Sequence, residues 1–199
     1  MEKKKNISKG IIIISLIIVI LVVAIVIGAF VIHDNKPFDV VEETLEGGKI
    51  SLTYSDEQNL FLIEGAIPTS DVVGKAADSA DLFFDFTVKT ILEEANSIDY
   101  SIVLVKDETL STAINKNIKV YLEKEKNGTF VSVVEPVIFS NNFKSNELGS
   151  TLMNIYKSSK TANGSDNYRL RMWLSDTAVY SSEQLQNFGV KIAIVGNAK

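Results

Sequence analysis

One alternating stretch near the end of the chain brings together residue types suited to gripping a ligand. Arg169, Arg171 and Trp173 occupy every second position of the run 168–174, so a β-strand there would place all three side chains on one face. An exposed cationic and aromatic face could bind acidic glycans or a partner loop. The simpler interpretation, which we favour, is a solvated face where the arginines stack beside the tryptophan and pair with acids of neighbouring strands. These three residues are the predicted binding site.

Other residues offer little catalytic or metal-binding chemistry. The 199-residue chain has no Cys and one His, His33, which excludes disulfide scaffolds, cysteine nucleophiles and thiolate zinc sites. Asp78, Asp81 and Asp85 could offer oxygens to Ca²⁺, but their spacing is not that of an EF-hand loop, and we interpret them as surface acids. No Walker, G-x-S-x-G or H-E-x-x-H motif occurs. The sequence therefore predicts no catalytic residue, no metal site and no cofactor.

The charge balance bears on the class of partner. The chain has 20 basic and 25 acidic residues, a formal net charge of −5, which argues against nucleic-acid binding. A hydrolase needs only two carboxylates, so an enzyme is the least favoured alternative.

The strongest signal is the segment 11–32, whose 22 positions carry no charge. A helix of this length covers about 33 Å, enough to cross a hydrocarbon core of about 30 Å. A cleaved signal peptide and a prepilin leader are less favoured alternatives, because the apolar run is longer than in most signal peptides and lacks the pilin glutamate. The residues that precede the run include four lysines, Lys3, Lys4, Lys5 and Lys9. By the positive-inside rule the N-terminus is cytoplasmic and the remainder lies outside the cell.

These elements give a domain organisation with four parts. We predict a basic cytoplasmic tail, a single transmembrane helix, a juxtamembrane stalk and an extracellular β-sandwich, at residues 1–10, 11–32, 33–48 and 49–199 respectively.

The outer part is dominated by apolar residues at every second position, the pattern of strands with one face on a core. The stretches with this pattern are 50–54, 82–88, 98–104, 118–122, 168–174 and 188–194, with shorter candidates at 59–64 and 129–134. Asn127-Gly128 predicts a two-residue hairpin, because both turn positions need positive φ. Strands at this spacing predict a mainly β fold, an antiparallel sandwich of the Ig-like or jelly-roll type. Short helical turns are predicted at 70–77, 148–156 and 182–186.

The same architecture carries a resemblance to a known group. A charged N-terminus and one apolar helix precede strands that read Phe84-Asp85-Phe86-Thr87-Val88, Tyr100-Ser101-Ile102 and Tyr168-Arg169-Leu170-Arg171-Met172-Trp173-Leu174. In this the chain resembles the camelysin/TasA-like surface and matrix-fibre proteins of Gram-positive bacteria. The resemblance implies a structural surface protein and transfers no catalytic residue.

We therefore expect a membrane-anchored cell-surface protein with a structural, adhesive or assembly role. The alternative is an accessory subunit whose sandwich binds an envelope protein or a glycan. The expected partners are the lipid bilayer, through residues 11–32, and either further copies of the chain or an envelope protein or glycan.

Overall fold

The computed structural model describes residues 41–54, 60–79, 82–145, 148, 151–179 and 186–199. No helix within these ranges is long and apolar enough to cross a membrane. The predicted tail 1–10 and transmembrane helix 11–32 lie outside the described residues.

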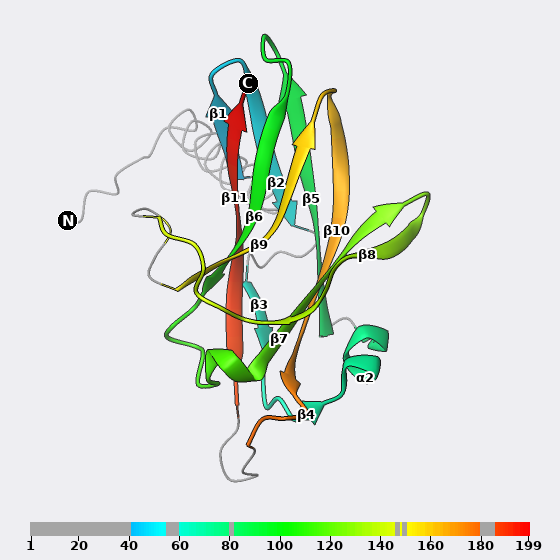
Figure 1. The fold of residues 1–199 in the computed structure, drawn as a ribbon, viewed down its shortest axis with the longest axis vertical. Coiled ribbons are helices and arrows are strands. Elements are labelled where there is room, and N and C mark those ends of the chain that lie inside the picture. Colours follow the sequence, from blue (N-terminus) through cyan, green and yellow to red (C-terminus); the bar gives the residue numbers. More distant parts are fainter. Residues whose placement is uncertain (1–40, 55–59, 80–81, 146–147, 149–150, 180–185) are drawn as a thin grey trace, which may run out of the picture. The chain divides into compact units, whose positions relative to one another are not determined.

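The described chain is mainly β and forms two sheets (Figure 1). The larger one, sheet A, has the strand order β1-β2-β5-β10-β7-β8, and the short strand β4 pairs in parallel with β10. The bounds of its strands are β1 Val41–Leu45, β2 Gly48–Tyr54, β4 Pro68–Thr69, β5 Phe83–Leu92, β7 Ile118–Lys126, β8 Thr129–Ile138 and β10 Gly164–Ser175.

The smaller sheet, sheet B, has the order β3-β11-β6-β9, and all of its pairs are antiparallel. Its strands are β3 Leu60–Ile63, β6 Ile98–Lys106, β9 Leu152–Lys160 and β11 Phe188–Ala198. Two short helices complete the described elements, α2 at Asp71–Ala76 and the 3-10 turn η2 at Asn115–Asn117.

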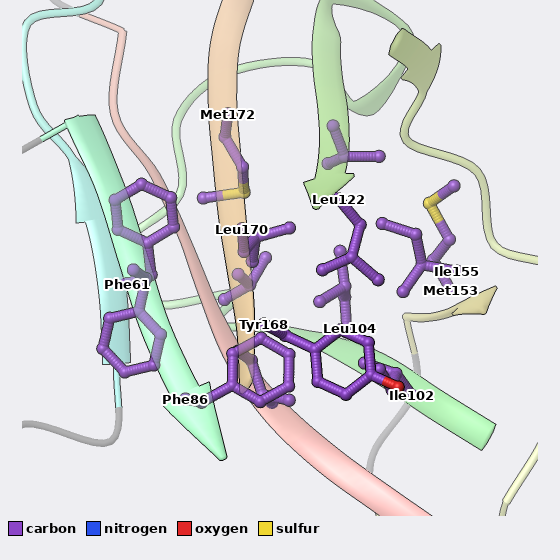
Figure 2. Packing of buried hydrophobic residues seen from close by; sticks show 14 of the residues in the cluster. Phe61, Phe86, Ile102, Leu104, Leu122, Met153, Ile155, Tyr168, Leu170 and Met172 are labelled. Atoms are coloured by element: carbon purple, nitrogen blue, oxygen red, sulfur yellow. The ribbon is translucent and has the colours of Figure 1, made fainter. Parts of the chain in front are cut away.

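The core lies between the two sheets and is built from the predicted alternate positions. Figure 2 shows Leu170 and Tyr168 of β10 among side chains contributed by both sheets, such as Leu122 of β7 and Leu104 of β6. A tyrosine hydroxyl also bridges the two layers. The Tyr54 hydroxyl of sheet A donates to the Ile192 carbonyl of sheet B at 2.8 Å. The two sheets are therefore joined by apolar packing and by a hydrogen bond between them.

The strand predictions are confirmed, including the two shorter candidates, which are β3 and part of β8. The hairpin at Asn127-Gly128 is confirmed as well, because both residues have positive φ, 53° and 78°. The turn predicted at 70–77 is α2, whose N-cap Ser70 accepts a hydrogen bond from the Val73 amide at 3.5 Å.

Two sequence predictions are wrong. The stalk predicted at 33–48 includes strand β1, because Gly47, with φ +85°, lets the chain turn back and pair Val41–Leu45 with β2. The acidic residues Glu42 and Glu43 interrupt the apolar pattern from which strands were predicted, so β1 was missed. Charged residues are nevertheless well tolerated on an edge strand such as β1. The helical turn predicted at 148–156 overlaps β9, where pairing with β6 overrides local preference. Most of the turn predicted at 182–186 lies outside the described residues.

The hairpin glycine provides a clean test of backbone strain. Replacing Gly128 by Ala should destabilise the protein by about 1 kcal/mol, because the new Cβ meets no atom within 4 Å and only the positive φ opposes it. Gly164→Ala is the matched control, since its surroundings are equally open and its φ is not positive. Urea unfolding should separate the two variants, and an equal loss in both would contradict the assigned turn.

Candidate functional site

The three predicted binding residues lie on one face of β10, as the alternation requires. Tyr168, Leu170, Met172 and Leu174 point into the core, so Arg169, Arg171 and Trp173 occupy the opposite, outer face of sheet A. Their shared face is thus confirmed, while their availability to a ligand depends on what covers that face.

Arg169 is fully engaged within the sheet. Its Nε and Nη2 donate to the two carboxylate oxygens of Asp85 at 2.7 and 2.8 Å. The guanidinium also lies 3.9 Å from the ring centroid of Phe83 and 4.3 Å from that of Phe130. A bidentate ion pair between two rings is among the most rigid settings for an arginine, so Arg169 stiffens the sheet.

Arg171 and Trp173 are buried, with 4% and 5% of their surfaces exposed. Arg171 donates through Nε to Glu123 Oε2 at 2.9 Å and through Nη1 to the Ala77 carbonyl. The prediction of an exposed stripe is therefore wrong at these two positions. The expected pairing with acids of neighbouring strands is confirmed, but on a face that α2 and Ala77 cover.

Helix α2 packs directly on the Trp173 indole. A Cβ added at Gly74 would lie 2.4 Å from Cδ2 of that ring, so only glycine permits this approach. The helix is held at its start by an ion pair of 2.7 Å between Asp71 and Lys119. A second ion pair, of 3.2 Å between Lys75 and Glu135, joins the helix to β8. The position of α2 therefore depends on a missing side chain and two charge pairs.

A gap in sheet A lies beside the same part of β10. Pairing of β10 with β5 ends at Arg171 and Phe83, whereas pairing with β4 begins at Leu174 and Pro68. Within the described chain, the two β10 residues between these points have no paired residue on that side.

A pocket of about 440 Å³ occurs at this gap. Met172, Trp173 and Leu174 line it from β10, and residues 62–66 line it from β3 and the loop that follows. Ile67 and Leu82 also line it and are 62% and 42% exposed. This volume lies within the range of small-ligand sites, and the lining suits an apolar group.

The Trp173 indole adds one unused donor to this region. Its Nε1 is buried and has no hydrogen-bond acceptor among the described residues. Buried donors without an acceptor are rare in folded proteins. Of the three residues predicted from sequence, Trp173 alone lines the pocket.

A second polar cluster joins the two sheets in the core, and the sequence analysis missed it. The Asp166 carboxylate receives Lys124 at 2.8 Å, Lys160 at 2.6 Å and the Tyr100 hydroxyl at 3.0 Å. Tyr100 and Tyr168 share a further hydrogen bond of 2.6 Å. The sequence does carry a signal for this cluster. Asp166 in β10 and Lys124 in β7 are charged residues of opposite sign that occupy core-facing positions of their strands.

Burial and charge act in opposite directions on the ionisation of this cluster. Burial opposes ionisation of Asp166, but hydrogen bonds from Lys124 and Lys160 prevail and lower its pKa. Burial raises the pKa of Tyr100 and Tyr168, which keeps both phenols protonated as donors. The arrangement is a clamp between the sheets, in which one carboxylate accepts hydrogen bonds from two ammonium groups and a phenol.

The outer face of sheet B carries a more open depression of about 570 Å³. Its lining includes Asp99 and Ser101 of β6, Lys157 and Ser159 of β9, and Asn197 of β11. Hydroxyl, amide and charged groups together suit a polar ligand such as a saccharide. No group of three or more potential metal-ligating side chains occurs within the described ranges.

Comparisons with known protein families and with curated proteins give no match to this chain.

Replacing Gly74 by Ala tests the contact between α2 and Trp173. Alanine favours helix over glycine by about 1 kcal/mol, but the collision with the indole should reverse this and destabilise the protein by about 1–3 kcal/mol. The emission of Trp173, the only tryptophan, should shift as the ring moves. Val72→Ala, on the exposed side of α2, should change stability by less than about 0.5 kcal/mol. A more stable Gly74→Ala variant with unchanged emission would rule out this packing.

The Asp166 clamp predicts a pH-dependent stability. Asp166→Asn should cost about 1–3 kcal/mol at pH 7, because it leaves Lys124 and Lys160 without their carboxylate. The native pKa of Asp166 is lowered, so its contribution is complete above the unfolded pKa of about 4 and is lost as the pH falls through the native pKa. Urea unfolding from pH 7 down to about pH 2 should show the two proteins converging. Glu94→Gln, at an exposed turn, should show no such convergence.

Proposed function

We propose that this chain is a single-pass membrane protein that presents a non-catalytic β-sandwich binding module outside the cell, in a structural, adhesive or assembly role. The observation that carries the binding role is the apolar pocket beside Trp173, whose lining residues Ile67 and Leu82 are exposed to solvent.

The sequence supports the membrane anchor. The 22 positions of segment 11–32 carry no charge, and four of the residues before it are lysines. A polypeptide backbone in lipid must satisfy its own hydrogen bonds, so this segment would span as a helix. The lysines would hold the N-terminus on the cytoplasmic side.

The electrostatics of the β10 face support binding over catalysis. Arg169 is paired with Asp85 and Arg171 with Glu123. Each of these charges therefore already has a partner of opposite charge within the sheet. The pocket lining is mostly aliphatic and aromatic, which provides shape and apolar contact for a partner group.

An accessory role in glycan binding is the second candidate. The depression on sheet B favours it, because Ser101, Lys157 and Asn197 could donate hydrogen bonds to sugar oxygens over an apolar floor that includes Val195. The relationship to camelysin/TasA-like proteins and the assignment of the sandwich as Ig-like or jelly-roll stay predictions.

Cysteine labelling of intact cells tests the proposed topology, because the chain has no native cysteine. The full chain with Ala162→Cys, in the exposed turn between β9 and β10, should react with a membrane-impermeant maleimide on intact cells. Ser8→Cys, in the basic tail, should react only after permeabilisation. The reverse pattern would contradict the orientation, and recovery of the chain in the soluble fraction would contradict the anchor.

A further inference from the structure

We propose that the pocket beside Trp173 binds an extended peptide. In this arrangement an apolar side chain of the peptide fills the pocket, the Trp173 indole donates to a peptide carbonyl, and a basic residue of the peptide lies near Glu64. The inference rests on the proposed binding role of the same pocket and adds the chemical class of the partner.

The Trp173 indole supplies a hydrogen-bond donor that the described residues leave unused. The residue lines the pocket, is 5% exposed, and has no acceptor for its Nε1. A buried donor without an acceptor costs free energy. A ligand that places a carbonyl oxygen against this donor would therefore recover that cost on binding.

A second unused polar atom belongs to a residue that is bonded to the pocket wall. The main-chain carbonyl of Gln186 accepts from the amide of Ala66, a lining residue, at 2.8 Å. The side-chain Oε1 of Gln186 is buried and has no donor among the described residues. An amide group offers both an acceptor and a donor. Peptide groups therefore complement the two unused atoms, whereas a hydrocarbon complements neither.

Strand β10 also offers main-chain groups at the pocket. Its pairing with β5 ends at Arg171 and its pairing with β4 begins at Leu174. Met172 and Trp173, which lie between these points and line the pocket, have no paired residue on that side within the described chain. Successive residues of a strand direct their N–H and C=O groups to opposite sides, so one of the two directs both groups toward the gap. Such groups are the ones that bind an added peptide strand.

The remaining lining suits an apolar side chain of that peptide. The pocket has a volume of about 440 Å³. Ile67 and Leu82 line it and are 62% and 42% exposed. A leucine or phenylalanine side chain that enters the pocket would remove apolar surface from water on both partners, which stabilises the complex.

The charge of the lining favours a basic peptide over an acidic one. Glu64 is exposed and is the only charged residue among the described residues that line the pocket. None of the ion pairs between described residues includes it. In an extended peptide, a lysine two positions from the apolar residue lies on the same face and can approach this carboxylate. A glutamate at that position would bring two like charges together.

Peptide binding to the full chain in phosphatidylcholine nanodiscs tests the proposal. Trp173 is the only tryptophan, so the isotope-labelled chain gives a single indole N–H resonance. The probe is the blocked peptide acetyl-Lys-Thr-Leu-Thr-Lys-amide, which should shift the indole proton downfield in a saturable manner as the donor gains an acceptor. Two matched peptides, with glycine for the leucine or with glutamate for both lysines, should bind about tenfold more weakly.

Variants of the chain separate the contributions to binding. Glu64→Lys should reverse the preference between the lysine and glutamate peptides, whereas the matched control Glu46→Lys, at an exposed turn, should leave it unchanged. Trp173→Phe keeps an aromatic ring without the donor and should weaken the lysine peptide about fivefold in calorimetry. Ile67→Ala should also weaken it while leaving the unfolding midpoint unchanged, since Ile67 is exposed.

The outcomes distinguish this inference from the proposed function. An indole resonance that shifts with cyclohexanol, an apolar probe, but with none of the peptides would overturn the peptide and leave the pocket as an apolar binding site. A resonance that neither probe moves would overturn both the inference and the binding role. Equal binding of the lysine and glutamate peptides, or equal binding by the Trp173→Phe variant, would contradict the recognition proposed here.

Discussion

The burial of both faces of β10 is the constraint on which the rest of the structure depends. One face of this strand closes the core between the sheets, and the far half of the other face lies under α2. On a strand covered on both sides, a polar group without a partner is costly, because an unsatisfied buried group costs more free energy than a hydrogen bond contributes. Among the β10 side chains only Trp173 Nε1 is left without a partner. This cost explains why Arg171 is matched to Glu123 and the Ala77 carbonyl on one face, and Asp166 to two lysines on the other.

The same constraint creates the candidate site. Because α2 covers the Trp173 ring and β4 replaces β5 beside β10 near Leu174, sheet A is interrupted where its central strand is most deeply buried. The result is an apolar pocket at the edge of a well-packed core, with Ile67 and Leu82 exposed at its lining. A rigid frame with one interruption suits recognition, since the frame is ordered before any partner arrives.

The sequence by itself determined most of the strands, because alternation of apolar and polar residues directly encodes burial on one side. It also determined the Asn127-Gly128 turn and the helix capped by Ser70, which follow from local backbone chemistry. It placed Arg169, Arg171 and Trp173 on one face but could not decide their exposure. That was decided by α2, almost a hundred residues earlier in the chain, which covers Trp173 because Gly74 has no side chain. Strands β1 and β9, the Asp166 clamp and the pocket were likewise settled only by tertiary structure, since each requires segments distant in sequence to meet, and local patterns carry no record of those contacts.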